Sequence, residues 1–247
     1  MMLLVDIGNT RVKWGLSRGR EISATGAFAH VDRAPAELWP AAWRESARPE
    51  RVVVANVAGP RIAESLRAYC REHFQLTPEF VASASQAAGV TNGYRNPAQL
   101  GADRWAAVIG AYTRQGGPVC VVGCGTAITV DTVSREGRHL GGLIAPGLGT
   151  MQRALAAASA ALPAEPGGVI ELFARDTRTA VTSGVLFAVT GFVERAIAEI
   201  RAQQGDELAI LLTGGDVEAL QPWLRERVTL APHLVLEGLA VLAEART

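Results

Sequence analysis

Two short segments of the chain could bind phosphate groups, because each places glycine and threonine in a turn between two predicted strands. The first is Asp6-Ile7-Gly8-Asn9-Thr10, after an apolar run from Met2. A tight turn with glycine exposes backbone N–H groups that hold phosphate oxygens. Asp6, at the strand end, could bind Mg²⁺ directly or through water, and Lys13 could reach a phosphate as a point charge. The alternative interpretation is an ordinary hairpin whose Asp and Asn satisfy the turn backbone.

The second segment, Gly123-Cys124-Gly125-Thr126-Ala127-Ile128-Thr129, has the same character. Gly125 and Thr126 offer N–H and O–H donors without bulk. Two such loops that face each other would hold a polyphosphate from both sides. Asp131 follows Thr129 by two residues, so on a strand the two side chains point to the same side. The alternative is that Asp131 faces solvent.

A third segment, Gly101-Ala102-Asp103-Arg104, could act on a substrate hydroxyl and a substrate anion. The carboxylate could accept a proton, and the guanidinium could bind a carboxylate or phosphate through two hydrogen bonds. Asn96 and Pro97 predict a helix that starts at Pro97 and runs to about Arg114, which would place this segment about two turns inside it. A solvated helix face is the alternative interpretation.

Three glycine-rich corners carry weaker signals. Glycines at a strand end let a flat ligand approach the backbone, and a helix N-terminus favours anions. They are also common turn residues. The corners are Gly141-Gly142, Pro146-Gly147-Leu148-Gly149 and Gly214-Gly215-Asp216.

These segments need strands and helices to position them, and the pattern predicts two similar α/β halves. Each half opens with three strands in a meander and continues with helix and strand units. The first half has predicted strands at 2–7, 11–17, 21–30, 51–57 and 79–82, and helices at 35–46, 60–74 and 97–114. The second has predicted strands at 118–123, 127–133, 138–144 and 207–212, and helices at 148–162, 177–203, 216–226 and from 234. We therefore expect domains at 1–115 and 116–247, with a ligand site in a central cleft.

Composition excludes several classes of function. The chain has 247 residues, with 24 Lys+Arg against 24 Asp+Glu, so it shows no electrostatic footprint for nucleic acid or an anionic membrane. No apolar run in the sequence approaches the ~18 to 20 residues of a membrane span, and the N-terminus has no basic signal-peptide region. Three cysteines, an odd and sparse set, suit a reducing cytosol. We expect a cytoplasmic protein without nucleic-acid or membrane partners.

Familiar nucleotide and metal motifs are missing from the sequence. It has no G-x-x-x-x-G-K-[ST], no G-x-G-x-x-G after the first strand, no zinc-ligand spacing and no G-x-S-x-G. Two phosphate-type loops that open two similar halves, without a P-loop, resemble the actin/Hsp70/sugar-kinase superfamily.

Several short motifs make this resemblance more specific. DIGNT at 6–10, Tyr94 followed by Asn96-Pro97, GADR at 101–104, CGTAIT at 124–129 and GLIAPG at 142–147, in this order, resemble the type III pantothenate kinase family. The resemblance implies an α/β fold of two RNase H-like/actin-like domains. It also implies ATP-dependent phosphorylation of pantothenate to 4′-phosphopantothenate, the first step of coenzyme A biosynthesis, by a homodimer that needs Mg²⁺ and K⁺ or NH4⁺.

The resemblance also implies roles for individual residues. Asp103 would be the general base, and Asp6 would hold Mg²⁺. The residues implied for ATP are Asp6, Ile7, Gly8, Asn9, Thr10, Arg11, Val12, Lys13, Gly125 and Thr126. Those implied for pantothenate are Tyr94, Gly101, Ala102, Asp103, Arg104 and Thr177.

One position departs from the family pattern. The family usually has an aspartate two residues before the glycine of GTA, where it binds the monovalent cation, and here that residue is Gly123. We therefore expect a weaker dependence on K⁺.

Two other functions remain alternatives. One is a non-catalytic regulatory homologue, since members of this family were also described as Bvg accessory factors tied to transcription. The other is another small-molecule kinase of the superfamily, such as a sugar or acetate kinase. The presence of Asp6, Asp103 and Arg104 favours catalysis over the regulatory role.

Overall fold

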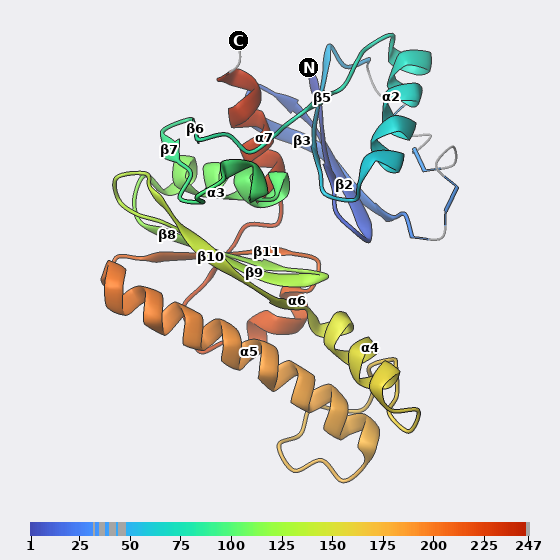
Figure 1. Cartoon of the computed structure of the whole chain (residues 1–247), viewed down its shortest axis with the longest axis vertical. Coiled ribbons are helices and arrows are strands. Elements are labelled where there is room, and N and C mark those ends of the chain that lie inside the picture. Colours follow the sequence, from blue (N-terminus) through green and yellow to red (C-terminus); the bar gives the residue numbers. More distant parts are fainter. Residues whose placement is uncertain (32, 35–37, 40–42, 44–47, 246–247) are drawn as a thin grey trace. The chain divides into compact units, whose positions relative to one another are not determined.

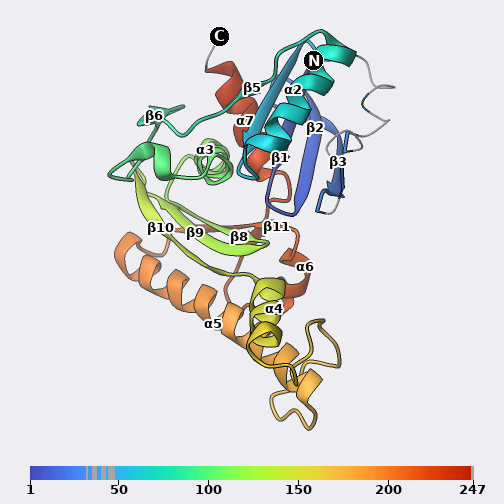
Figure 2. The ribbon, with the colours of Figure 1, turned by 45° about the vertical axis from the view of Figure 1, so that its right-hand side comes forward.

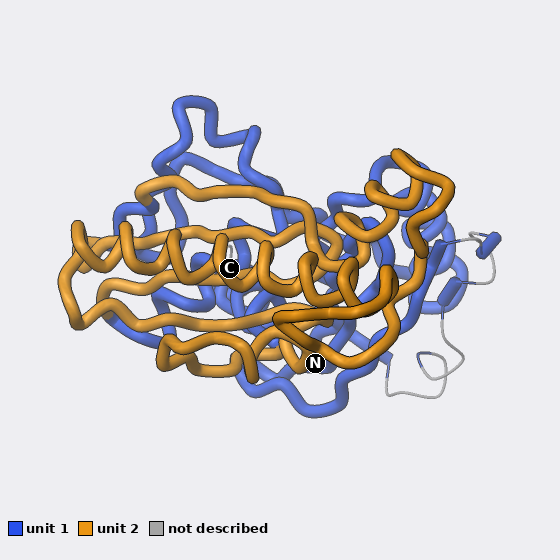
Figure 3. The backbone as a smooth tube through the Cα atoms, turned by 90° about the horizontal axis from the view of Figure 1, so that it is seen from below, with its two compact units in different colours: residues 1–116, 137–139, 233–247 blue, residues 117–136, 140–232 orange. Residues whose placement is uncertain are grey.

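The protein, described here by a computed structural model, divides into two compact units (Figure 3). Residues 1–31, 33–34, 38–39, 43 and 48–245 are described. Unit 1 comprises residues 1–116, 137–139 and 233–247, and unit 2 comprises residues 117–136 and 140–232. The first division falls at Gly116, beside the predicted boundary, but residues 137–139 and 233–247 cluster with unit 1 instead of the second half.

A five-stranded sheet in the order β3-β2-β1-β4-β5 forms the frame of unit 1 (Figure 1). Strands β1, β2 and β3 make the predicted antiparallel meander, whereas β4 and β5 continue the sheet in parallel. The bounds are β1 Met2–Ile7, β2 Arg11–Arg18, β3 Glu21–Ala29, β4 Arg51–Asn56 and β5 Glu79–Phe80. A small separate hairpin follows, with β6 Gln86–Ala87 and β7 Val90–Thr91.

The two faces of this sheet are covered by different helices (Figure 2). Leu3, Val5 and Ile7 point into a core shared with α2 (Pro60–Phe74). Because side chains alternate along a strand, Asp6 points to the opposite face. That face is covered by α3 (Ala102–Gln115) and α7 (Leu234–Glu244), which contact β1 and β4. The helix predicted over 35–46 lies largely outside the described residues.

Helix α3 begins five residues later than the sequence predicts. Asn96 does cap a turn, since its side chain accepts a hydrogen bond from the Ala98 N–H at 3.2 Å, but that turn is only the 3-10 helix η2 (Pro97–Gln99). Leu100 then adopts an extended conformation, and its carbonyl accepts a hydrogen bond from the Ser83 hydroxyl at 2.7 Å. Gly101 caps the new helix. The prediction was therefore wrong in placing Asp103 and Arg104 two turns inside a helix: they lie in its first turn.

Unit 2 repeats the strand order of unit 1, as the predicted halves require. Its sheet has the order β10-β9-β8-β11-β12, with β8 antiparallel to β9 and parallel to β11. The bounds are β8 Val119–Cys124, β9 Ala127–Val133, β10 His139–Pro146, β11 Ala209–Gly214 and β12 Thr229–Leu230.

The helices of unit 2 are α4 (Leu148–Ala158), α5 (Thr177–Gln204) and α6 (Val217–Leu220), the last followed by the 3-10 helix η3 (Gln221–Trp223). The helices predicted at 148–162 and 216–226 are thus shorter, because Ser159 and Leu224 adopt extended backbone conformations. In the described chain, α5 alone is long and apolar enough to cross a membrane, but half of its most apolar window is buried. Leu186, Val189 and Val193 pack in the unit 2 core, which explains this apolar character.

Candidate functional site

The first glycine turn joins β1 to β2 as predicted. The Gly8 N–H donates to the Arg11 carbonyl at 3.0 Å and closes the turn. In the ladder, Asp6 lies opposite Lys13, so these two side chains are cross-strand neighbours on one face of the sheet. Asn9 and Arg11 are exposed at the turn, whereas Val12 is buried.

His30 holds this turn from the other side, and the sequence analysis missed it. Its backbone N–H donates to the Thr10 carbonyl at 3.2 Å. Its ring Nε2 lies 2.7 Å from the Gly8 carbonyl oxygen, and because a carbonyl only accepts, Nε2 carries the proton. The pairing of Arg11 with Ala29 brings His30 there, so the predicted third strand was the one available signal.

The carboxylates of Asp6, near the end of β1, and of Asp103 interact electrostatically. Asp6 is only 9% exposed, and among the described residues its Oδ1 has no hydrogen-bond partner. Burial, together with the nearby negative charge of Asp103, raises the pKa of Asp6 to about 7, although Lys13 opposes the shift. A group that brings positive charge or a proton would relieve both carboxylates, so the pair is suited to Mg²⁺ or to a substrate hydroxyl.

The first turn of α3 presents Asp103 close to its own backbone. Its Oδ1 accepts a hydrogen bond from the Arg104 N–H at 2.8 Å. A Cβ at Gly101 would lie 2.6 Å from the same oxygen, so glycine leaves room for the carboxylate. The positive end of the helix dipole favours a negative charge at this position. Gly101, Ala102 and Asp103 are half-buried.

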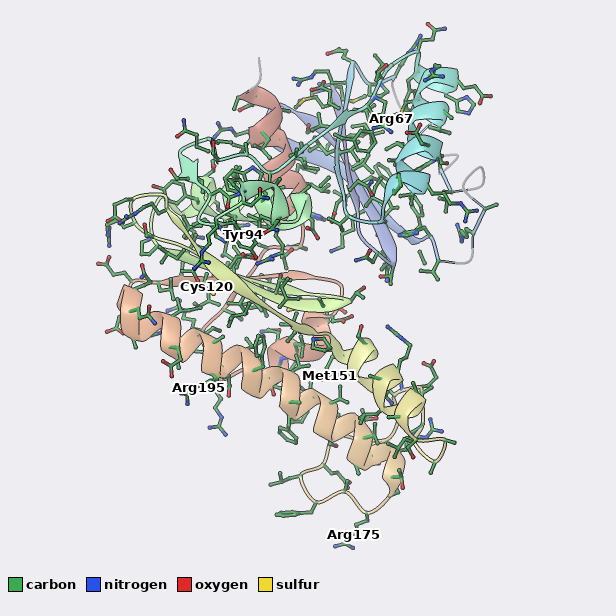
Figure 4. All side chains as sticks on the ribbon, in the orientation of Figure 1. Arg67, Tyr94, Cys120, Met151, Arg175 and Arg195 are labelled. Carbon is green, nitrogen blue, oxygen red and sulfur yellow. The ribbon has the colours of Figure 1, made fainter. Side chains whose placement is uncertain are left out.

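Arg104 turns toward Tyr94, and the sequence analysis grouped both residues as expected pantothenate contacts. Its side chain is 8% exposed, and Nη1 donates to the Tyr94 hydroxyl at 2.9 Å. The guanidinium carbon lies 5.7 Å from the centre of the Tyr94 ring, which is within the range of a cation–π contact. Tyr94 lies beside α3 (Figure 4). Unit 1 thus brings together Asp6, Lys13, Tyr94, Asp103 and Arg104 on the described chain.

The second glycine turn contacts two of the glycine-rich corners that the sequence analysis treated separately, those at Gly147 and at Gly214. Gly125 donates to the Ala127 carbonyl at 3.2 Å and closes the turn. The Thr126 carbonyl accepts from the Gly147 N–H at 3.0 Å and from the Thr150 hydroxyl at 2.7 Å, which fixes the start of α4 beside the turn. A Cβ on Gly147 would collide with the Gly125 carbonyl oxygen.

The other corner follows β11. The Asp216 N–H donates to the Cys124 carbonyl at 3.1 Å, and Gly214 has a φ of 120°. A Cβ on Gly214 would collide with the Cys124 carbonyl oxygen, so only glycine fits here. The close approach of these backbones explains why the glycines occur at these places.

Gly123 pairs with Thr129 across β8 and β9. A Cβ at position 123 would lie 2.5 Å from the Thr129 hydroxyl oxygen, so this hydroxyl lies where a side chain at 123 would begin. Asp131 is buried, which excludes the solvent-facing alternative. Thr177 begins α5 in unit 2, is exposed and follows Asp176, which caps the helix by accepting from the Thr179 N–H at 2.9 Å.

Comparison with known proteins gives one consistent family. Residues 2–199 match the family model described as type III pantothenate kinase. A type III pantothenate kinase of Nitrosococcus oceani is 38% identical over 99% of this chain and 94% of its own length. One of Alkalilimnicola ehrlichii is 41% identical over 98% of this chain and 97% of its own length.

Solved structures show the fold. A Baf-family protein of Campylobacter jejuni, named as a candidate transcriptional activator, has a TM-score of 0.57 at 22% identity and covers 99% of this chain and 98% of its own. A ROK-family glucokinase of Streptomyces griseus has a TM-score of 0.52 at 14% identity and covers 99% of each chain. The sugar-kinase likeness confirms the predicted actin-like class of fold.

Proposed function

The chain belongs to the type III pantothenate kinase family and is therefore an ATP-dependent kinase that phosphorylates pantothenate in coenzyme A biosynthesis, and we propose that Asp103 is its general base. The observation that carries this assignment is the buried Asp6 carboxylate, whose Oδ1 has no hydrogen-bond partner among the described residues and whose pKa is raised by burial and by the negative charge of Asp103. A pair of carboxylates with a perturbed pKa is typical of a reactive centre.

In the proposed reaction, the Asp103 carboxylate accepts a hydrogen bond from the primary hydroxyl of pantothenate and takes its proton as the oxygen attacks the γ-phosphorus of ATP. The bond to the leaving ADP oxygen breaks as the new P–O bond forms. Such a transfer depends on positioning and charge neutralisation more than on covalent help. The fixed backbone of the first turn of α3 holds the carboxylate in place.

The Asp6 carboxylate suits Mg²⁺, because its buried Oδ1 has no hydrogen-bond partner on the described chain and faces a second negative charge. We propose that Asp6 holds this ion directly or through water. When bound, Mg²⁺ neutralises charge on the phosphate oxygens of ATP. Lys13, opposite Asp6 in the ladder, contributes a fixed positive charge toward the same phosphates.

Arg104 and Tyr94 supply the groups that bind the substrate anion. The guanidinium donates to the carboxylate of pantothenate, and its hydrogen bond to the Tyr94 hydroxyl restricts its orientation. Gly101, Ala102 and Thr177 are proposed substrate contacts from the family resemblance.

The two glycine turns are proposed to bind ATP. In unit 1 this turn spans Asp6 to Lys13, and in unit 2 it contains Gly125 and Thr126. We therefore propose that the two halves bind different groups. Residues 1–115 contain the first phosphate-binding turn and the GADR segment, and residues 116–247 contain the second turn and bind the adenosine of ATP.

The monovalent cation is proposed to matter less here than in the family pattern. Gly123 supplies no side-chain oxygen, and the Thr129 hydroxyl lies where such a side chain would start. The residues present therefore do not fit a carboxylate-bound K⁺, and no step of the reaction runs through it. A rate that rises steeply when K⁺ replaces a tetraalkylammonium salt would contradict this proposal.

We propose that the protein forms a homodimer through exposed apolar side chains of unit 2. The edge strand β10 exposes Leu140, Leu143 and Ile144, the last to 64%. Exposed apolar residues on a sheet edge favour association with another chain. Ile144→Lys should shift the mass in light scattering from dimer to monomer. Leu230→Lys, an exposed residue on the opposite edge strand β12, should leave it unchanged.

We further propose a cytoplasmic location without nucleic-acid or membrane partners. The charges balance at 24 of each sign, and all three cysteines are buried and free, which suits a reducing compartment.

The test of the function is ADP release by the purified protein with ATP, Mg²⁺ and pantothenate. Release should require pantothenate, and mass spectrometry should find 4′-phosphopantothenate. Glucose in place of pantothenate is the matched control, since the protein shares its fold with a glucokinase. Release with glucose alone would point to another small-molecule kinase. No release from folded protein would favour the regulatory alternative.

A further inference from the structure

A buried histidine lies against the proposed substrate-binding tyrosine, and neither the sequence motifs nor the proposed reaction use it. His139 is 1% exposed, and its ring stacks on that of Tyr94 with centroids 5.8 Å apart and planes 16° apart. The histidine opens β10, yet residues 137–139 cluster with unit 1. Because the ring is enclosed, it acts through its neighbours and does not meet a substrate in solution.

The tip of the β9–β10 hairpin fixes His139 in place. The Thr91 N–H donates to the Gly137 carbonyl at 2.9 Å. Gly137 has a φ of 76°, and a Cβ there would collide with the Gly89 carbonyl oxygen and lie 3.2 Å from the Tyr112 hydroxyl. A residue with a side chain does not fit there, so glycine lets the tip pack closely against Gly89 and Tyr112 of the same unit, two residues before the histidine.

The backbone of Tyr94 is held separately from its ring. Its N–H donates to Asn92 Oδ1 at 3.0 Å, and Asn92 Nδ2 donates to the Ala84 carbonyl at 3.2 Å. These bonds place the Cα of Tyr94 but leave rotation about its side-chain bonds open. The flat face of His139 restricts that rotation, because stacking favours one ring plane.

The ring plane of Tyr94 in turn matters for Arg104. Its hydroxyl accepts the hydrogen bond from Arg104 Nη1 at 2.9 Å, and the guanidinium carbon lies 5.7 Å from the ring centre. A change in the tyrosine ring would move both contacts. The three side chains therefore form a series, in which the histidine orients the tyrosine and the tyrosine orients the arginine.

We propose that His139 is a positioning residue for substrate binding, which sets the orientation of Tyr94 and, through it, that of the Arg104 guanidinium toward the substrate carboxylate. The inference rests on the proposed function, since it assigns Tyr94 and Arg104 to pantothenate. It predicts an effect on pantothenate binding that does not extend to ATP.

The test is steady-state kinetics of His139→Ala and His139→Phe with each substrate varied in turn. His139→Ala should raise the KM for pantothenate roughly three- to tenfold, the range expected for the loss of one aromatic pair. The KM for ATP and kcat should stay within about twofold of wild type. His139→Phe keeps a flat ring and should restore the KM for pantothenate. His139→Leu, which fills the space without a ring, should behave as His139→Ala does and replaces it where the alanine variant does not fold.

The matched control is His73→Ala. His73 also packs on a tyrosine of unit 1, Tyr69, with ring centroids 4.4 Å apart. Its loss should leave both KM values unchanged. An unchanged KM for pantothenate in both His139→Ala and His139→Leu would overturn the proposal, and so would failure of His139→Phe to restore it.

A double-mutant cycle tests whether His139 acts through Tyr94. In a Tyr94→Ala background, His139→Ala should change the KM for pantothenate no further. Additive effects would show that the histidine acts independently of the tyrosine and would overturn the proposal. Wild-type protein in the same series distinguishes failure of the proposed function from failure of this inference. If wild type shows no pantothenate-dependent turnover, the proposed function is refuted. If wild type is active and His139→Ala has an unchanged KM for pantothenate, only the inference about His139 is refuted.

Discussion

Asp6 illustrates how the burial of a proposed site residue affects the folded protein. A carboxylate at the end of an apolar strand loses its hydration, and here it also faces the negative charge of Asp103. Lys13 compensates only in part, because the pKa of Asp6 is still raised to about 7. The fold thus leaves at this point a carboxyl group whose ionised form it does not satisfy, which is consistent with the cation-binding role proposed for it.

This raised pKa makes stability depend on pH in a defined direction. The pKa of Asp6 is about 7 in the folded protein and near 3.8 unfolded, so between these values the folded state binds more protons. Without Mg²⁺, the free energy of unfolding should therefore fall as the pH rises from about 4 to about 7, and level off above that. Urea unfolding across this range measures the slope.

The control for this prediction is Asp6→Asn, which has no proton to lose. Its slope should be shallower than that of wild type, and its stability should exceed wild type most at pH 8. Addition of Mg²⁺ at pH 8 should stabilise wild type and not Asp6→Asn. Equal slopes for the two proteins would assign the pH dependence to other groups.

The proposed general base gives a second residue-scale prediction. Asp103→Asn keeps the shape and an acceptor for the Arg104 N–H, but it removes the proton acceptor. We expect kcat to fall by roughly 10²- to 10⁴-fold, the usual contribution of general acid–base catalysis. The KM for pantothenate and the melting temperature should change little. Near-normal kcat in the folded variant would remove Asp103 from this role.

At the scale of elements, the crossing of α3 and α7 depends on two glycines. A Cβ on Gly238 would collide with the Ala106 carbonyl oxygen of α3. A Cβ on Gly110 would lie 2.7 Å from the Leu234 carbonyl oxygen of α7. The two backbones therefore touch, and neither helix can accept even a methyl group without moving away. Since α3 carries Asp103 at its start, this packing also positions the proposed base.

Gly238→Ala should accordingly destabilise the protein by about 1 to 3 kcal/mol or more, the cost of overpacking. Gly184→Ala is the matched control, because Gly184 lies in α5 and a Cβ there meets nothing within 4 Å. Helix propensity favours that substitution by up to about 1 kcal/mol. Thermal melting of both variants compares them directly, and similar melting temperatures would contradict a backbone contact between α3 and α7.

The sequence predicts an element well where the cause is local. The turn at Gly8 was predicted, and the helix predicted to run to about Arg114 ends at Gln115, where Gly116 caps it in the αL conformation. The start of α3 was not, because the Ser83 hydroxyl that binds the Leu100 carbonyl is remote in sequence. The same limit hid His30 and His139, whose partners lie on other strands and loops.

At the scale of the whole molecule, the sequence predicted two repeated α/β halves but not which segments build each unit. The strand order is the same in both sheets, and this follows from a repeated order of elements. Helix α7, however, belongs to unit 1 although it ends the chain. Its buried leucines, such as Leu236 and Leu239, could pack equally well against either sheet. Their spacing therefore predicts a helix but does not indicate which of the two sheets that helix covers.

Removal of residues 233–247 should therefore unfold the rest of unit 1, although these residues are far in sequence from residues 1–116. The truncated chain would leave Trp105 and Ile109 of α3, which are fully buried, near an uncovered face. We expect increased binding of a hydrophobic dye and rapid proteolysis within residues 1–116. A truncated protein with a protected unit 1 would contradict this role for α7.

The place of α7 also bears on how the protein is made. The ribosome synthesises β1 first and reaches Leu234, the start of α7, roughly two hundred residues later. Synthesis of that intervening segment takes on the order of ten seconds or more. Throughout that time the nascent first unit lacks the helix that covers one face of its sheet. Translation must therefore finish before the first-made segment can fold, and a chaperone that binds apolar surface has its opportunity during synthesis.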